Sequence, residues 1–359
     1  MIHDYEPLIK DECSLAMKEP TKKAAQIIAD AIHANKKILV RYHDDCDGVC
    51  SALLLESAIK RYSEDAHPVM KQGDSAVYAE EDAKYDAERL EGEERPLIVL
   101  LDHGANSESL KGVAFAASFA GVLIIDHHPP HEETIKAASH YLGPFKYGGG
   151  SQHCAALLCH GVAQALTNSA EENYAWYALD ADHSPLSKQH FKESVVIDYL
   201  AVTLERPKPS KYLEVLENPT AVQACYLRAV NAVKAALERA KSRMHSIHTK
   251  KFSFYLLDVD FLEKGGYPSK GKIVNAFQDE HEEEDCVSIA YGDTTALFRV
   301  SCGAHEKGLK ANKFIDELKA RLPNKIFSGG GHEQAASMRF KKGALNEVLE
   351  EIGKLIQTR

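Results

Sequence analysis

The sequence has no long apolar run and no basic leader. Its most apolar stretches, 96–102 and 121–126, are far shorter than the ~20 residues that a helix needs to cross a bilayer. Residues 1–14 are acidic and lack the basic-then-apolar pattern of a secretion signal. We therefore expect a cytoplasmic protein with no membrane partner.

Positive charge is also in deficit. The chain holds 43 Lys and Arg against 53 Asp and Glu, and the excess of acid lies before residue 250, because 250–359 contains 17 residues of each sign. A surface that wraps a long nucleic acid needs Lys and Arg to neutralise phosphates. The acidic first part is better suited to housing cations.

Regular cysteine spacing is missing too. Eight cysteines without a pattern indicate thiols in a reducing compartment, not a disulfide framework. Cys154 and Cys159, next to His153 and His160, raise the question of zinc. Their segment reads as a helix and a second Cys/His pair is absent, so we do not expect a zinc site there.

What the first half does contain is an alternation of apolar strands and helices. The runs 36–42, 96–102 and 121–126 are β-rich, and each precedes a helical stretch. Continuous apolar strands followed by helices are typical of a parallel sheet covered on both faces. The fold class predicted for this part is therefore α/β, with a doubly wound parallel sheet.

The second half changes character. Residues 192–249 read as helices broken by prolines, and beyond them half-buried strands alternate with a helix at 310–322. We expect a smaller C-terminal α/β domain with a mixed sheet, and a catalytic cleft between it and the first domain. The expected organisation is a catalytic domain at 1–191, a helical connector at 192–249 and a substrate-binding domain at 250–359.

Each predicted strand of the first half ends in chemically active side chains. The carboxyl ends of parallel strands share one edge of the sheet, so these groups are expected to form one site. Crowded carboxylates and imidazoles repel and desolvate each other unless a cation lies among them, and this donor set suits manganese, with iron, cobalt or magnesium as substitutes. Side chains alternate along an extended strand end, so His43, Asp45 and Asp47 should converge, and Gly48 should let the chain turn into the next helix. The residues are His43, Asp45 and Asp47, then Asp102, then Asp126, His127 and His128.

Five motifs, in order, resemble those of the DHH phosphoesterases. HDDCDG at 43–48 is similar to the His-x-Asp-x-Asp-Gly motif, Asp102 begins the second motif, and 126–128 is the Asp-His-His triplet. Asp182 best meets the fourth motif, with Asp180 as its rival. GGGH at 329–332 resembles the substrate loop of the DHH-associated C-terminal domain.

This resemblance implies two metal ions, Mn2+ or else Mg2+ or Co2+. It also implies catalytic roles for Asp102 and for His128, which would contact the phosphate. The implied metal ligands are His43, Asp45 and Asp102 for one ion and Asp47, Asp102, His127 and Asp182 for the other. The implied substrate-binding residues are His128, Arg299, Gly330, Gly331 and His332.

The substrate class follows from the resemblance and the charge together. Net acidity and the lack of an aromatic-plus-basic track disfavour long strands. We predict a manganese-dependent phosphodiesterase that hydrolyses short oligonucleotides or dinucleotides to 5′-mononucleotides. A RecJ-like exonuclease acting on single-stranded DNA or RNA is the first alternative, and a non-catalytic module that binds nucleic acid or replication proteins is the second. Whether the chain forms a homodimer is left open.

Overall fold

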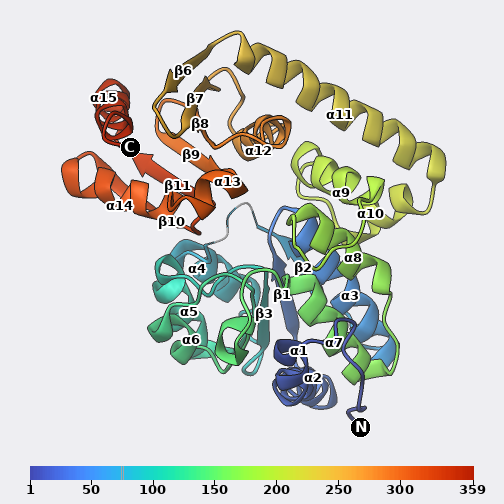
Figure 1. The fold of residues 1–359 in the computed structure, drawn as a ribbon. Helices are drawn as coiled ribbons and strands as arrows, with labels where there is room; N and C mark the ends of the chain where they lie inside the picture. Colours follow the sequence, from blue (N-terminus) through green and yellow to red (C-terminus); the bar gives the residue numbers. More distant parts are fainter. Residues whose placement is uncertain (74, 76) are drawn as a thin grey trace. The chain divides into compact units, whose positions relative to one another are not determined.

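The protein is seen in a computed structural model that describes residues 1–73, 75 and 77–359. They form two compact units, Met1–Tyr226 and Leu227–Arg359, and the division falls inside helix α11 (Pro219–Lys241) (Figure 1). Each unit is built on a sheet of its own. The predicted fold class, a parallel sheet in the first part and a mixed sheet in the second, is confirmed.

The N-terminal sheet is entirely parallel, with strand order β2-β1-β3-β4-β5. All residues of β1 and β3 are buried, as expected for strands covered on both faces. The order reverses between β1 and β3, and in open α/β sheets such a switch point opens a crevice at the carboxyl ends. The strands are β1 (Ile38–Tyr42), β2 (Val69–Gln72), β3 (Leu97–Leu101), β4 (Gly121–Ile125) and β5 (His140–Leu142).

Helices cover both faces of this sheet (Figure 1). Alternate side chains of each strand point to opposite faces of the sheet and enter two separate cores. Val40 and Val99 lie in one core, and Leu39 and Ile98 lie in the other. The first core includes α2 (Lys18–His33), α3 (Cys46–Tyr62), α7 (Ala155–Thr167), α8 (Glu172–Ala181) and α9 (Lys192–Thr203), and the second includes α4 (Glu80–Arg89), α5 (Leu110–Phe119) and α6 (Glu132–Ala137). The unit also contains α1 (Glu12–Ala16) and α10 (Pro209–Leu216).

Strands β2 and β5 were not expected from the sequence. The helical stretch expected after 121–126 is confirmed only for α6, which ends at Ala137, and residues 140–142 form β5. Tyr141 and Leu142 instead pair in parallel with Ile124 and Ile125 of β4. Burying these two side chains at the sheet edge outweighs the short helical pattern.

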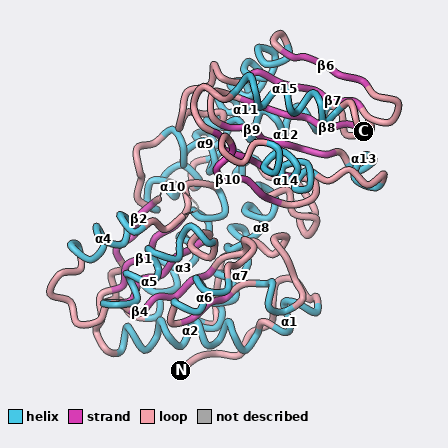
Figure 2. Tube along the Cα trace, turned by 90° about the vertical axis from the view of Figure 1, so that its left-hand side faces the viewer, coloured by secondary structure: helices cyan, strands magenta, loops and turns pink. Residues whose placement is uncertain are grey.

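The C-terminal sheet has the order β10-β11-β9-β8-β7-β6 and is antiparallel except for the pair β7–β8. Figure 2 shows its strands in magenta. The core on one face contains α14 and α15, and the core on the other contains α12 and the end of α11. The elements are β6 (Met244–His248), β7 (Ser253–Asp258), α12 (Lys270–Glu280), β8 (Cys286–Tyr291), β9 (Thr295–Val300), α13 (Cys302–Glu306), α14 (Ala311–Arg321), β10 (Ile326–Gly331), β11 (Ala335–Phe340) and α15 (Leu345–Ile356).

Candidate metal centre

The loop after β1 is shaped by the start of α3. Asp45 is the N-cap of this helix, and its Oδ1 accepts a hydrogen bond from the backbone N–H of Gly48 at 2.9 Å. Asp47 therefore lies in the first helical turn, and the extended strand end predicted through residue 47 is wrong. Gly48 does not turn the chain. A Cβ there would lie 2.4 Å from the carbonyl oxygen of His43, so glycine is needed for close approach.

Asp47 is anchored by a helix distant in sequence. Its Oδ2 accepts from the N–H of Ala155 at 2.7 Å and its Oδ1 from the N–H of Ala156 at 2.6 Å, at the first turn of α7. Its side chain is 1% exposed. The neighbouring Cys46 N–H donates to Asp198 Oδ1 at 2.8 Å. The loop is thus fixed from two sides before any ion is considered.

Asp102 stands at the middle of the site. It follows β3 with φ of +59°, a left-handed conformation that is uncommon outside glycine and occurs often at functional sites. Its Oδ2 lies 3.2 Å from His43 Nδ1, and its Oδ1 lies 3.2 Å from His127 Nε2. His43 Nδ1 is also 2.7 Å from Asp45 Oδ2. The end of β3 thereby joins the loops that follow β1 and β4.

His127 faces three carboxylates with one nitrogen. Its Nδ1 lies 2.7 Å from the carbonyl oxygen of Ser151, so a proton on Nδ1 would leave Nε2 as a lone-pair donor. Nε2 lies 3.6 Å from Asp47 Oδ2 and 3.7 Å from Asp182 Oδ2, in addition to its contact with Asp102. Asp47, Asp102, His127 and Asp182 therefore lie together; the family resemblance implied these four residues as the ligands of a second ion.

Asp180, the rival of Asp182, is engaged elsewhere. Its carboxylate accepts from the N–H of Phe191 at 2.8 Å and from Ser194 Oγ at 2.5 Å, at the start of α9. It also contacts His190. These bonds fit a structural cap for α9, and only Asp182 of the two lies against His127. The role of Asp182 as a ligand stays a prediction.

His128 projects from the same loop with its ring held in place. Asp126 Oδ1 accepts from the backbone N–H of His128 at 3.0 Å and lies 2.8 Å from its Nδ1. Asp126 Oδ2 accepts from the N–H of Ala105 at 3.0 Å, which ties this carboxylate to the loop after β3. The His128 side chain is 38% exposed. Its Nε2 is therefore the ring nitrogen available to a ligand.

Burial and like charge perturb the pKa values of this cluster. Burial and the charge of Asp102 raise the pKa of Asp47 to about 7, and burial together with Asp47 raises that of Asp182 well above its usual range. Burial opposes a charged imidazole, but the neighbouring carboxylates raise the pKa of His127 and of His43 well above the ordinary value. Without a metal, the site therefore gathers protons.

The donor set fits a divalent cation. Asp102 Oδ1 and Asp182 Oδ2 are buried and have no hydrogen-bond partner in the described structure. Three groups of side chains could each hold an ion, because within each group the ligand atoms lie within 4.8 Å of one another. A cation would satisfy the orphaned oxygens and replace the gathered protons. The groups are His43, Asp45 and Asp102; Asp102, His127 and His128; and Asp47, Cys154 and Asp182.

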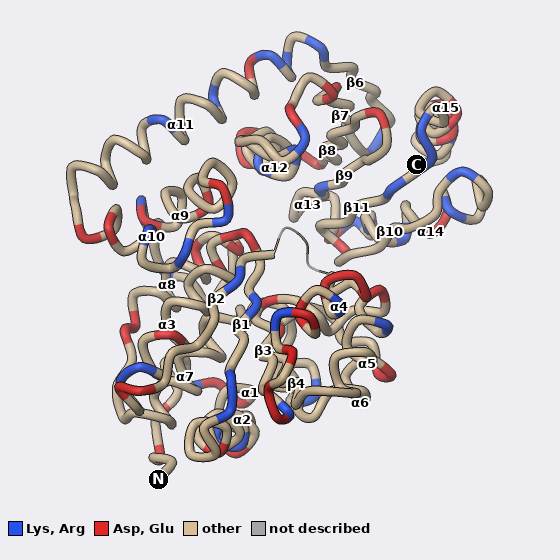
Figure 3. Tube along the Cα trace, turned by 180° about the vertical axis from the view of Figure 1, so that it is seen from behind, with Lys and Arg blue, Asp and Glu red and all other residues tan. Residues whose placement is uncertain are grey.

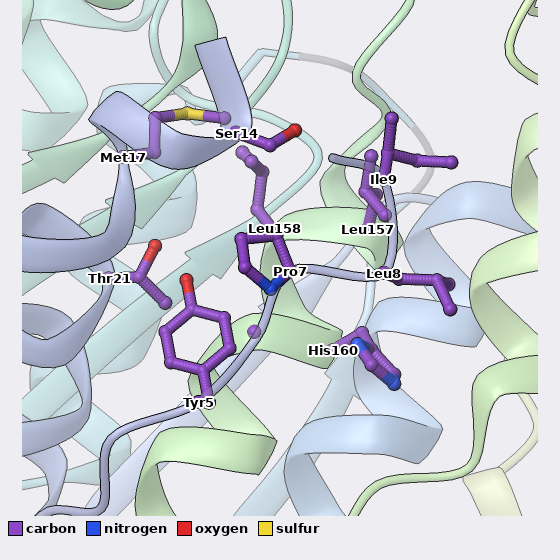
Figure 4. Close-up of a pocket in the computed structure, with 11 residues that line it drawn as sticks. Tyr5, Pro7, Leu8, Ile9, Ser14, Met17, Thr21, Leu157, Leu158 and His160 are labelled. Atoms are coloured by element: carbon purple, nitrogen blue, oxygen red, sulfur yellow. The ribbon is translucent and has the colours of Figure 1, made fainter. Parts of the chain in front are cut away.

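The last group contains a residue that sequence reasoning did not place at this centre. Cys154 is fully buried beside Asp47 and Asp182, immediately before the α7 turn that binds Asp47. The one sequence feature that could have placed Cys154 at this centre is its position directly before α7. Its suspected partners point elsewhere: His153 Nε2 lies 2.7 Å from Asp11 Oδ2, and His160 lines a small pocket between the N-terminal segment and α7 (Figure 4).

The predicted substrate residues of the C-terminal unit gather near the ends of β9 and β10. Residues 329–331, expected as a loop, are strand residues that pair with β11. Gly331 has φ of +138°, and a Cβ there would lie 2.5 Å from the carbonyl oxygen of Ala335. The N–H of His332 donates to that same oxygen at 2.7 Å. Arg299, opposite Ala335 in the register, is oriented by a 2.6 Å bond from its Nε to Asn275 Oδ1.

Two parts of the chain match the models of known domain families. Residues 37–179 match the model of the DHH family N-terminal domain, and residues 269–358 match that of the DHHA1 domain. The chain therefore contains a DHH family N-terminal domain followed by a DHHA1 domain.

Known proteins resemble the chain at low identity. An uncharacterised protein of Methanocaldococcus jannaschii is 23% identical to this chain. The alignment is 420 residues long with its gaps and covers 98% of this chain and 55% of that protein. The chain thus spans about half the length of this curated relative. In the part that the structure describes, no helix is both long and apolar enough to cross a membrane.

Solved structures share the fold. The DHH domain of a protein described as a member of a ribosomal protein family has a TM-score of 0.87 at 24% identity, covering 99% of this chain and 94% of that one. RecJ of Thermus thermophilus in complex with Mn2+ has a TM-score of 0.64 at 15% identity, covering 95% and 58%. The predicted RecJ-like architecture is confirmed at the level of fold.

Proposed function

We propose that the chain is a divalent-metal-dependent phosphodiesterase that releases 5′-mononucleotides from short oligonucleotides or dinucleotides. The observation that carries this proposal is the meeting of Asp47, Asp102, His127 and Asp182 at the carboxyl edge of one sheet, with buried carboxylate oxygens left unpaired. Carboxylates that crowd in this way need a cation, and the matches to the DHH and DHHA1 domains support phosphoester hydrolysis.

The two predicted ion sites divide the cluster. His43 and Asp45 would hold one ion, Asp47, His127 and Asp182 would hold the other, and Asp102 would serve both. Divalent cations bound here would supply an activated water and neutralise charge on the phosphoryl oxygens. Carboxylate with imidazole suits Mn2+, and we propose Mn2+ with Mg2+ or Co2+ as substitutes. The RecJ neighbour of Thermus thermophilus was crystallised with Mn2+.

His128 and the C-terminal residues would handle the substrate. His128, held at Nδ1 by Asp126, would donate from Nε2 to a nonbridging oxygen as charge develops there. Gly330 and Gly331 would let the terminal phosphate approach the backbone closely, and the imidazole of His332 would contact it. Arg299, fixed by Asn275, would add a guanidinium to the same anion.

A single-strand exonuclease is the second candidate. The fold shared with RecJ favours it, and so does a local excess of basic residues in the C-terminal unit. The two candidates share the metal centre and differ in the length of strand that they cleave. Substrate length therefore decides between them.

The test is a cleavage assay with Mn2+ and end-labelled RNA and DNA of two, five and twenty-five nucleotides. Preferential cleavage of the dinucleotide and pentamer supports the proposal, and shortening of the long DNA alone supports the exonuclease. Asp102→Asn keeps the side-chain shape and should abolish turnover. Asp65→Asn, at an exposed carboxylate after α3, is the matched control. A chain that cleaves no substrate with any divalent metal would refute both candidates and favour the binding module.

A further inference from the structure

The C-terminal unit has a pocket that the proposed chemistry does not use. It has a volume of about 260 Å³, and Glu317 is the one acidic side chain among the lining residues. Five lining residues are Lys or Arg. We call this the basic pocket and define it by Lys251, Lys307, Lys310, Lys313 and Arg359.

The surrounding sequence concentrates positive charge. Residues 307–342 contain nine Lys and Arg against three Asp and Glu, although 250–359 as a whole is neutral. Figure 3 shows Lys and Arg in blue on α14, which supplies one wall of the pocket. A local excess of this size attracts anions even on a chain whose total charge is negative.

The basic pocket lies at the same end of the C-terminal sheet as the loop that carries His332. Ser253, Cys286, Val300 and Ala335 lie at the same end of four successive strands, so residues 251–252 and the loop at 332–334 leave the sheet at that end.

The contact between the pocket and that loop is direct. Lys310 Nζ lies 2.6 Å from Glu333 Oε1, and Glu333 directly follows His332. His305 Nε2 lies 2.8 Å from Glu333 Oε2 and fixes the carboxylate from its other side. A ligand seated at His332 would therefore extend into the basic pocket.

The cations of the pocket are available to a stronger anion. Lys307, Lys310, Lys313 and Arg359 pair with Asp285, Glu333, Asp316 and Glu317, respectively. These pairs are partly or largely exposed and contribute little, so a phosphate can displace the carboxylates. Lys251 is exposed and has no ion-pair partner among the described residues.

The aromatic rings of the pocket do not offer faces to bases. Phe252 and Phe314 are 8% and 2% exposed, so they form the floor. Stacking platforms for single strands require accessible rings. The pocket is thus suited to reading phosphates without reading sequence.

We propose that the basic pocket binds the phosphodiester backbone of a single strand whose terminal nucleotide occupies Gly330–His332. This inference rests on the proposed function and sets its substrate class: strands several nucleotides long are held at both places, and dinucleotides only at the first. Binding is electrostatic and independent of base sequence.

The test compares binding of the full chain to labelled oligothymidines of two, five and twenty-five nucleotides, with EDTA present to prevent cleavage. The variant is Lys251→Gln with Lys313→Gln. The control is Lys341→Gln with Lys342→Gln, two exposed lysines at the opposite end of β11. The pocket variant should lose about tenfold more affinity for the longer strands than for the dinucleotide. Its slope of log affinity against log salt should fall by about 1.4, from two lost contacts at ~0.7 each.

Several outcomes would overturn the inference. A pocket variant that keeps the wild-type length dependence and salt slope, or a wild-type chain that binds no strand, contradicts it. Tripolyphosphate is the third ligand: if the pocket variant weakens its binding but leaves strand binding intact, the pocket serves free polyphosphate instead. Cleavage measured in parallel separates the claims, because a wild-type chain that cleaves short strands upholds the proposed function even when the pocket variant behaves as wild type.

Discussion

Removing divalent metal should make the N-terminal unit less stable as the pH rises. Asp47 illustrates the sign: burial and Asp102 raise the pKa of its carboxyl from 3.8 to about 7 in the folded chain. Between these pH values the folded state binds more protons than the unfolded state, so stability falls with rising pH. Asp182, His43 and His127 also have raised pKa values, and their contributions act in the same direction.

The size of the effect follows from the shift. Three pKa units at 1.36 kcal/mol each give a loss of about 4 kcal/mol from Asp47 alone between pH 4 and pH 7. Bound metal replaces the protons and restores stability. At one hundred times its dissociation constant, each bound ion adds about 2.7 kcal/mol.

The assay is urea unfolding at pH 5, 6, 7 and 8, in EDTA and in Mn2+. Trp176 is the only tryptophan of the chain and packs on the N-terminal core, so its fluorescence reports that unit alone. Asp182→Asn should flatten the pH dependence in EDTA and reduce the gain from Mn2+, and Asp65→Asn should change neither. Equal pH dependence in EDTA for the wild type and Asp182→Asn would refute the reasoning, because buried His160, whose pKa is lowered to about 4, adds the same opposite trend to both chains.

Three further variants test separate contacts. Asp126→Asn should lower kcat by about 10–100-fold with unchanged Mn2+ stoichiometry, because it frees the ring of His128; a kcat within twofold of wild type would contradict this. Gly331→Ala should destabilise the C-terminal unit by about 1–3 kcal/mol in thermal unfolding, whereas Gly330→Ala should leave its stability unchanged and weaken only substrate binding. Burial lowers the pKa of His160 to about 4, so the wild-type chain should lose about 3 kcal/mol of folding stability as the pH falls from 6.5 to 4. His160→Leu should remove this loss in unfolding experiments. Equal acid sensitivity in variant and wild type would speak against this.

The strand ends could be predicted because buried parallel strands have a strong signature. β1, β3 and β4 are apolar runs with polar residues directly after them, and topology brings those residues to one edge. The short strands β2 and β5 have no such signature. β2 is half-buried and β5 has three residues, so their existence depends on pairing with β1 and β4.

The finer geometry depends on partners distant in sequence. Asp47 points inward because the first turn of α7, more than 100 residues away, supplies two N–H donors, and no local pattern encodes this. The left-handed conformation of Asp102 is likewise set by the surrounding fold. Asp180 and Asp182 differ by two positions in one helical run, and the start of α9 decides which one is free to face His127.

Calorimetric titration of the metal-free chain with Mn2+ tests the central claim most directly. The account predicts two ions for each wild-type chain, one for Asp182→Asn, and loss of both high-affinity sites for Asp102→Asn, whose carboxylate would serve both ions. A wild-type chain that binds no Mn2+, or an Asp102→Asn chain that still binds two ions, would contradict it.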